Sequence, residues 1–316
     1  MARRPIRWLL PILCGVLVGA AAGCHQPVDW IANSYYMARA TPADASQLGC
    51  SNGSKTGRMT LFFGAPTTVN GTPGATLWGA PDRDTNQVAQ TVQDFIRGYA
   101  WCRTNPGYRL LIGVGISNSA IDGLSDEWLT THGQHWALLT TYLQQWADAY
   151  YPGVARVNAA WDFEPSWSAY SKAEAWMHGY DFTPGRPLLY ANSSADGCPT
   201  QTATNGFCNN GWSQHYVWHL AWEHDPSIPI PQIYRTDGVQ ARQWQLIDLW
   251  ATTFNGDGMW FYGTLSQWGA CAQVGGCTGT DNSPHAANDQ LIWWLNTDSR
   301  TTQGQVETMT DVSWNS

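Results

Sequence analysis

The stretch from Val154 to Trp167 is mostly apolar but contains two carboxylates, Asp162 and Glu164, two residues apart. Two carboxylates close together are typical of a catalytic or binding site, where their surroundings shift their pKa values. In an extended strand alternate side chains point to the same side, so Asp162 and Glu164 share a face. The sequence therefore predicts a pair of acids at one end of a strand.

The residues before the acids have the pattern of a strand in a parallel barrel. Apolar side chains occupy one face and small or polar ones the other; the apolar face is Val157, Ala159, Trp161 and Phe163. An apolar face packs on surrounding helices while the other face looks into the barrel, and Pro165 ends the strand. The alternative is that the acids interact with the start of the following helix, which Ser166 or Ser168 opens.

Seven segments with strand patterns alternate mainly with helical patterns. The expected strands are 58–65, 108–118, 154–164, 186–194, 216–223, 229–235 and 258–267. The expected helices are 85–101, 126–151, 169–180, 240–254 and 286–296. This alternation predicts an α/β fold, a (β/α)8 TIM-type barrel over 58–300 that is irregular or incomplete, with an eighth strand in the N-terminal segment as one option. The remaining parts are a tether and irregular segment at 25–57 and a polar, loosely held tail at 301–316.

Further polar or aromatic side chains fall at the predicted strand ends. Small residues on the inner face of 108–118, such as Gly113 and Gly115, leave room inside the barrel, and Ser117 and Asn118 end that strand near the rim. The candidate substrate-binding residues at the same rim are Tyr190, Asn192, Trp222, Glu223, Gln232, Tyr234 and Gln267. Glu223 is also a reserve second carboxylate. For the polar members, the alternative is a side chain inside the barrel that satisfies a neighbour.

Residues 1–24 have the composition of an export signal, with Arg3, Arg4 and Arg7 before an apolar stretch and small residues. Ala22-Gly23-Cys24 resembles the lipobox of bacterial lipoproteins, in which Cys24 is acylated; an ordinary cleaved secretion signal is the alternative. The six remaining cysteines predict disulfides in an exported chain, extracellular or at the cell surface, and sequence alone permits 15 pairings. We expect Cys198–Cys208, Cys271–Cys277 and Cys50–Cys102. Metal binding is the rival interpretation of these cysteines, but their spacings lack a close C-x-x-C pair.

Composition excludes several classes of partner. Without residues 1–24, the formal charge of −8 becomes −11, from 13 basic and 24 acidic side chains. Such an acidic chain with two lysines is not typical of a binder of nucleic acid or anionic lipid, so any membrane attachment should come from the lipid anchor. Stacking on sugars is one use for some of the 20 Trp; the alternative, packing in the core and between helices and barrel, accounts for most of them. The spacings predict no metal site and no cofactor.

Several of these motifs together resemble a known family. Asp162-Phe163-Glu164 resembles the D-x-E strand of the family 25 glycoside hydrolases, which are lysozyme-like barrels, and of related glycoside-hydrolase-like domains of exported bacterial proteins. The segments 187–192, 217–222 and 241–244 resemble later elements of those barrels, and the likeness spans about residues 58–296. The resemblance implies cleavage of cell-wall or related glycans, with Glu164 as proton donor and Asp162 assisting.

Two departures from the family leave catalysis open. The segment 61–64 lacks the acid of the family's first strand, and 264–267 lacks the Asp of its final strand. Two hypotheses follow. One is an exported, lipid-anchored glycoside hydrolase that uses Glu164 and Asp162; the other is a barrel that binds or scaffolds glycans without cleaving them. The sequence does not determine the oligomeric state.

Overall fold

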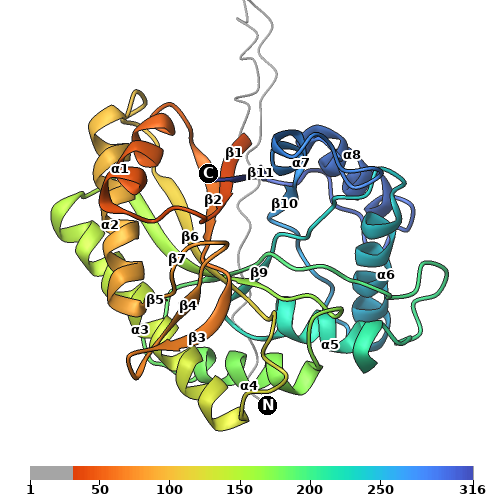
Figure 1. The fold of residues 1–316 in the computed structure, drawn as a ribbon. Helices are drawn as coiled ribbons and strands as arrows, with labels where there is room; N and C mark the ends of the chain where they lie inside the picture. The colour runs from red at the N-terminus through yellow and green to blue at the C-terminus, as the bar shows by residue number, and fades with distance from the viewer. Residues whose placement is uncertain (1–30, 316) are drawn as a thin grey trace, which may run out of the picture.

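The computed structural model describes residues 31–315, in which eight parallel strands form a nearly closed barrel with helices around it (Figure 1). The strands of the barrel are β1 (Ile31–Tyr36), β2 (Gly57–Phe62), β6 (Leu110–Ser117), β7 (Ala155–Asp162), β8 (Leu189–Ala191), β9 (Ser227–Pro229), β10 (Gly263–Ser266) and β11 (Thr308–Trp314). Their order in the sheet is β10-β11-β1-β2-β6-β7-β8-β9. The expected export signal and Cys24 lie outside the described residues.

The two edge strands, β9 and β10, are joined by a few bonds just beyond β9. The backbone N–H of Leu265 donates to Pro231 O at 2.9 Å, and that of Ile233 donates to Leu265 O at 2.9 Å. An isolated parallel bridge pairs Gln232 with Leu265. These contacts bring the open edges together and so draw the sheet into a barrel.

Helices cover the outside of the barrel. They are α1 (Pro42–Ser51), α2 (Thr85–Cys102), α3 (Asp126–Tyr150), α4 (Tyr170–Asp181), α5 (Gln214–Trp218), α6 (Val239–Phe254), α7 (Trp268–Gln273) and α8 (Pro284–Leu295), with a 3-10 turn η1 (Asn209–Gly211) and a π-helical turn η2 (His219–Glu223). Local signals start several of them. Asp84 and Gln87 form a reciprocal capping box at α2, and Ser125 and Ser283 cap α3 and α8.

The main core lies between the strands and the helices. The predicted outer face of β7 is buried there, and Trp161 packs against Trp176 of α4. Inside the barrel, Gly113 and Gly115 leave room for larger neighbours: a Cβ on Gly113 would lie 2.8 Å from the Tyr190 ring, and one on Gly115 2.9 Å from the Phe62 ring. The prediction that this face of β6 must be small is confirmed.

Both chain ends contribute strands that local patterns did not reveal. The segment 25–57 is expected to be a tether and irregular, with an eighth strand as one option, and β1 is that strand. The tail 301–316 is expected to be loosely held, but it contains β11. β1 and β11 pair in parallel from Ile31 with Met309 to Tyr36 with Trp314. Ser34 and Thr310 share a 2.7 Å hydrogen bond inside the barrel. Because the partners are far apart in sequence and partly polar, neither strand has a strong apolar pattern of its own.

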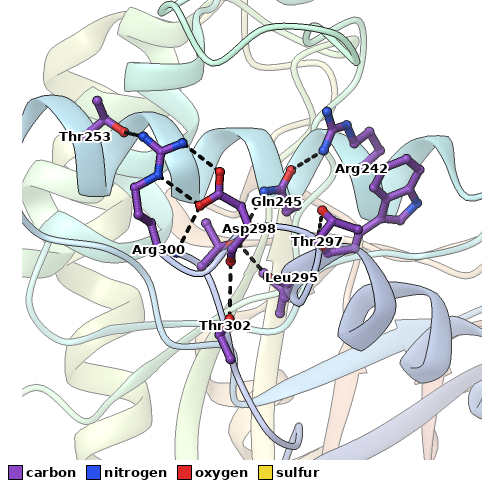
Figure 2. Close-up of polar contacts among 10 residues, drawn as sticks. Arg242, Gln245, Thr253, Leu295, Thr297, Asp298, Arg300 and Thr302 are labelled. Carbon is purple, nitrogen blue, oxygen red and sulfur yellow. Dashed lines mark hydrogen bonds and ion pairs between the residues drawn. The ribbon is translucent and has the colours of Figure 1, made fainter.

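The loop that leads to β11 is held against α6 and α8 by polar contacts (Figure 2). Arg300 pairs with Asp298 at 2.6 Å and donates to Thr253 Oγ1 at 3.2 Å. Thr301 Oγ1 donates to Leu295 O at 2.7 Å, at the end of α8. These bonds fix the polar chain after α8, which explains why it is ordered.

The expected strand 216–223 is also wrong, since this segment forms α5 and η2. Ser213 caps the helix by accepting from the backbone N–H of Tyr216. Val217, Leu220 and Ala221 are buried at helical spacing. The aromatic and β-branched composition favours a strand, but the cap and the packing on α6 decide for a helix.

The Gly- and Pro-rich loop after β2 contains a second, three-stranded antiparallel sheet. It is formed by β3 (Ala65–Val69), β4 (Thr72–Thr76) and β5 (Arg83–Asp84). Buried His132 of α3 accepts at Nδ1 from Trp176 Nε1 (2.9 Å), and its Nε2 lies 2.8 Å from Gly74 O. Burial lowers the pKa of His132 to about 4, so a neutral imidazole holds this small sheet on the barrel.

Three disulfides join the predicted partners. They are Cys50–Cys102, Cys198–Cys208 and Cys271–Cys277. The first ties α1 to α2, and the other two close short loops. Disulfides are typical of proteins that fold in an oxidising compartment outside the cytoplasm. No helix in residues 31–315 is long and apolar enough to cross a membrane.

Candidate functional site

Asp162 and Glu164 lie where β7 ends, on the strand-end face, the end of the barrel where the strands finish. Asp162 is the last residue of β7, pairs with Ser117 of β6 and is 2% exposed. Glu164 follows two residues later and is partly buried. The alternative role at a helix start is wrong, because α4 begins at Tyr170 and has no side-chain cap. Both acids are therefore free of a capping role on α4.

Asn118 fixes the backbone at Glu164. Its Oδ1 accepts from the Glu164 N–H at 2.9 Å, and its Nδ2 donates to Glu164 O at 3.0 Å and to Ser168 Oγ at 2.7 Å. Asn118 is fully buried just after β6. The neighbouring strand therefore holds the turn that carries Glu164, and the predicted position of Asn118 near the rim is confirmed.

Gln232 connects the acids to the opposite edge of the sheet. Its Nε2 donates to Asp162 Oδ1 at 2.6 Å and lies 3.4 Å from Asn192 O. Gln232 is 2% exposed. Since this residue also makes the bridge between the open edges, barrel closure and the position of Asp162 depend on the same segment.

The two acids share a site that favours their protonated forms. Burial raises the pKa of Glu164 to about 8, with a further rise from the negative charge of Asp196. Burial also raises the pKa of Asp162 well above its ordinary range, and the charges of Glu164 and Asp196 add to this. The hydrogen bond from Gln232 opposes the rise at Asp162. Glu164 therefore holds a proton at neutral pH, as a general acid requires.

Asp196 is a third carboxylate that sequence reasoning missed. It lies after β8, two residues before the loop closed by Cys198–Cys208, and the N–H of Asn209, just after that loop, donates to Asp196 O at 3.0 Å. Its charge acts on both Asp162 and Glu164. The loop has no periodic pattern, so only the nearby cysteine pair marks it in the sequence.

An aromatic cluster from distant segments lies beside the acids. Tyr36 ends β1, and its ring centroid is 4.8 Å from that of Trp314 and 5.4 Å from that of Trp78. All three side chains are partly exposed. Burial and the charges of Asp162 and Glu164 raise the pKa of Tyr36, which places its hydroxyl near the acids. Sequence reasoning missed this cluster because the pairing of β1 with β11 was not expected.

Tyr234 joins the acids to this cluster, as the rim prediction required. It is 8% exposed and packs with Phe62 and Leu265 inside the barrel. Burial and the neighbouring Tyr36, Asp162 and Glu164 raise its pKa. Of the predicted binding residues, Gln232 and Tyr234 thus lie with the acids.

Asn192 lies deeper, inside the barrel. Its Oδ1 accepts from Thr60 Oγ1 at 3.0 Å, across from β2, and the side chain is fully buried. Its Nδ2 has no hydrogen-bond partner. Gln232 Nε2 contacts both Asn192 O and Asp162 Oδ1, so Asn192 is linked to the acid pair through Gln232.

Four predicted binding residues do not reach the acids. Tyr190 fills the interior toward the strand starts, where its hydroxyl accepts from Asn158 Nδ2 at 2.6 Å. Trp222 and Glu223 lie on η2 outside the barrel: Trp222 Nε1 donates to Asp257 at 3.2 Å, and Glu223 lies 3.6 Å from His219. Gln267 donates to Thr280 O at 2.9 Å, just after the loop closed by Cys271–Cys277. Trp222 and Glu223 were placed wrongly because the expected strand 216–223 is helical. Tyr190 was placed wrongly because its long side chain extends through the barrel interior to Asn158.

The first and last strands differ from those assumed in the sequence. The first is β1, whose residues 31–36 contain no acid, and the last is β11, which contains Asp311. Asp311 accepts from Ser266 Oγ at 2.5 Å and from the backbone N–H groups of Trp268 and Gly269 at 2.9 Å. Its carboxylate therefore holds the start of α7.

Comparisons of the chain with models of protein families, with curated proteins and with solved structures find no match. Within residues 31–315, no group of three or more His, Cys, Asp and Glu side chains is arranged to hold a metal ion.

Proposed function

We propose that this chain is a (β/α)8 TIM-type barrel that hydrolyses glycosidic bonds, with Glu164 as the proton donor. The single observation that supports this most is the raised pKa of Glu164, about 8, at the strand-end face where barrel enzymes have their active sites. The resemblance of Asp162-Phe163-Glu164 to the family 25 glycoside hydrolases points to the same chemistry.

In this mechanism Glu164 donates its proton to the glycosidic oxygen as the bond to the anomeric carbon breaks. Positive charge develops at that carbon, and carboxylates on the other side stabilise it. Water then adds to the anomeric carbon, and its proton passes to the second carboxylate. That carboxylate releases the proton to solvent and Glu164 takes one up, so each turnover consumes one water.

The second carboxylate is Asp196 or Asp162. Asp196 is partly exposed beside the loop closed by Cys198–Cys208, which suits a group that must meet a substrate. Asp162 is almost fully buried and bonded to Gln232, which suits a group that tunes its neighbours. We assign Asp196 the role opposite Glu164, and Asp162 a supporting one.

The aromatic cluster of Tyr36, Trp78 and Trp314 supports a glycan as the substrate. Aromatic rings stack on the apolar faces of sugars, and the three rings here are partly exposed, with Tyr36 close enough to Asp162 and Glu164 for their charges to act on it. The three disulfides agree with an exported protein that meets glycans outside the cell, such as cell-wall polymers. Attachment to the membrane through Cys24 belongs to the same proposal.

A second candidate function is glycan binding without cleavage. The burial of Asp162 and its short bond to Gln232 favour it, because a carboxylate committed to a neighbour contributes less to catalysis. The two functions predict the same aromatic contacts but different products.

The experiment compares wild type with Glu164→Gln and Asp196→Asn on a panel of soluble and cell-wall glycans. Release of new reducing ends by wild type, with a loss of about 100-fold or more in Glu164→Gln, supports hydrolysis. The matched control is Asp289→Asn, which changes an exposed carboxylate on α8. A wild type that retains glycans but releases no ends would contradict hydrolysis and support binding.

A further inference from the structure

The strand-start face of the barrel, opposite the acids, carries most of the exposed aromatic side chains. We define this face as the last four residues of the helices that lead into barrel strands, the loops from helix to strand, and the first two residues of each strand. In a parallel barrel these segments meet at one end. Its exposed aromatic residues are Trp101, Tyr108, Tyr150, Phe182, Phe254, Trp260 and Trp293. They make up seven of the twelve large hydrophobic residues exposed in residues 31–315.

Hydrogen bonds confirm that these loops are neighbours. Thr104 N–H donates to Gly53 O at 2.9 Å, and Leu110 N–H donates to Val154 O at 3.0 Å. Farther around, Arg58 donates to Tyr262 O at 2.9 Å. The aromatic residues therefore lie on one continuous end of the barrel and are not scattered over its sides.

Charge is also distributed unequally between the strand-start face and the rest of the described chain. Residues 31–315 contain 13 basic and 23 acidic side chains. The basic ones on the strand-start face are Lys55, Arg58, Arg103, Arg109, Arg156, Arg186 and Arg300. The acidic ones are Asp148, Asp181, Glu223, Asp225, Asp257, Asp298 and Glu307. The seven basic and seven acidic side chains cancel, so the strand-start face has no formal net charge. The other 6 basic and 16 acidic side chains of residues 31–315 give a formal net charge of −10.

The chain also enters the barrel at this face, because β1 begins at Ile31. Cys24 is seven residues before Ile31. Seven residues of fully extended chain reach at most about 25 Å. An anchor at Cys24 would therefore keep the strand-start face close to the membrane and the acids directed away from it.

We propose that the strand-start face rests on the interfacial region of a phospholipid bilayer. Trp and Tyr favour this region because their rings are apolar and their edges are polar. A neutral face avoids the repulsion that the acidic remainder of the chain meets at anionic headgroups. The inference does not depend on hydrolysis, since it concerns the opposite end of the barrel.

The test mixes vesicles of phosphatidylcholine with each of three full-length proteins, all with the same residues 1–30. They are wild type, a strand-start variant (Trp101→Ser, Tyr150→Ser, Phe182→Ser) and a matched control on the other end (Phe207→Ser, Trp268→Ser, Val274→Ser). All six positions are at least half exposed, from 53% at Trp268 to 91% at Trp101, so the fold should tolerate them. Circular dichroism checks this for each protein.

Two measurements decide the outcome. Vesicles should slow amide hydrogen exchange in wild type in the loops 103–109 and 255–262 but not in 199–207, and the strand-start variant should lose this protection. Partitioning onto vesicles should weaken by about tenfold or more in the strand-start variant and stay unchanged in the control. Protection at 199–207 instead, no protection at either end, or equal behaviour of the two variants would overturn the proposal.

Discussion

Gln232 Nε2 lies 2.6 Å from Asp162 Oδ1, although the two residues are 70 positions apart in sequence. The bond connects the end of β7 to the segment that closes the barrel. It is the most direct link between the fold and the proposed chemistry, and removing it is the first prediction.

Gln232→Leu should reduce glycan hydrolysis by about 5- to 100-fold, because it leaves the buried Asp162 Oδ1 without its hydrogen bond, which costs about 1–3 kcal/mol. It should also raise the pKa of Asp162 further, since the bond favours the ionised form. Gln267→Leu is the matched control: its amide bonds Thr280 O, away from the acids. Equal kcat/KM values for the two variants would contradict the assigned role of Gln232.

The pH dependence of hydrolysis should show an alkaline limb near pH 8. Burial raises the pKa of Glu164 to about 8, so the proton that it must donate is present at neutral pH and is lost above that value. Measurement of kcat/KM between pH 5 and pH 10 tests this. A decline centred near pH 5 would mean that Glu164 is not the proton donor.

Asp196→Asn should move the same alkaline limb to lower pH. The negative charge of Asp196 raises the pKa of Glu164, and the substitution removes that charge. Asp289→Asn is an exposed control on α8 and should leave the limb in place. If the limb stays at its wild-type position in Asp196→Asn, Asp196 does not act on Glu164.

Asp248→Asn should stabilise the protein at alkaline pH. Asp248 is buried on α6 and accepts from the Met259 N–H at 2.7 Å, and burial raises its pKa from 3.8 to about 8. Because folding raises the pKa of Asp248, the protein is not destabilised by this group below pH 3.8, where the carboxyl is protonated in both states. The free energy of unfolding falls as pH rises from 3.8 to about 8, because the unfolded chain ionises Asp248 more easily. Asparagine keeps the acceptor without the charge.

The free energy of unfolding of Asp248→Asn should therefore exceed that of wild type at pH 9, by on the order of 2 kcal/mol. Urea unfolding at pH 5 and pH 9 measures the difference. A variant that is less stable than wild type at both pH values would refute the argument.

Gly113→Ala should destabilise the barrel by about 1–3 kcal/mol, because an added methyl group overpacks the interior. Its Cβ would lie 2.8 Å from the Tyr190 ring and 3.0 Å from Ala160 Cβ. Gly107→Ala provides the comparison, since its Cβ would meet only Asn105 Oδ1, at 3.9 Å. Similar unfolding midpoints for the two variants would show that the interior has space to spare.

The sequence by itself determined those features that depend on neighbouring residues. The alternation in β7, the small inner face of β6 and the capped helices α2 and α3 follow from local periodicity and caps, and they were predicted correctly. The three cysteine pairs were also predicted, two of them because short loops bring the partners together. Local pattern was therefore enough to place Asp162 and Glu164 at the end of a strand.

The tertiary structure decided which other residues join those acids. Tyr36 and Trp314 meet because β1 pairs with β11 across nearly the whole chain, and Asp196 arrives on a loop without any pattern. Conversely, Tyr190 points into the barrel and Glu223 lies on a helical turn outside it. The physical reason is that strand pairing and loop closure act between residues distant in sequence, where composition and periodicity carry no information about the partner.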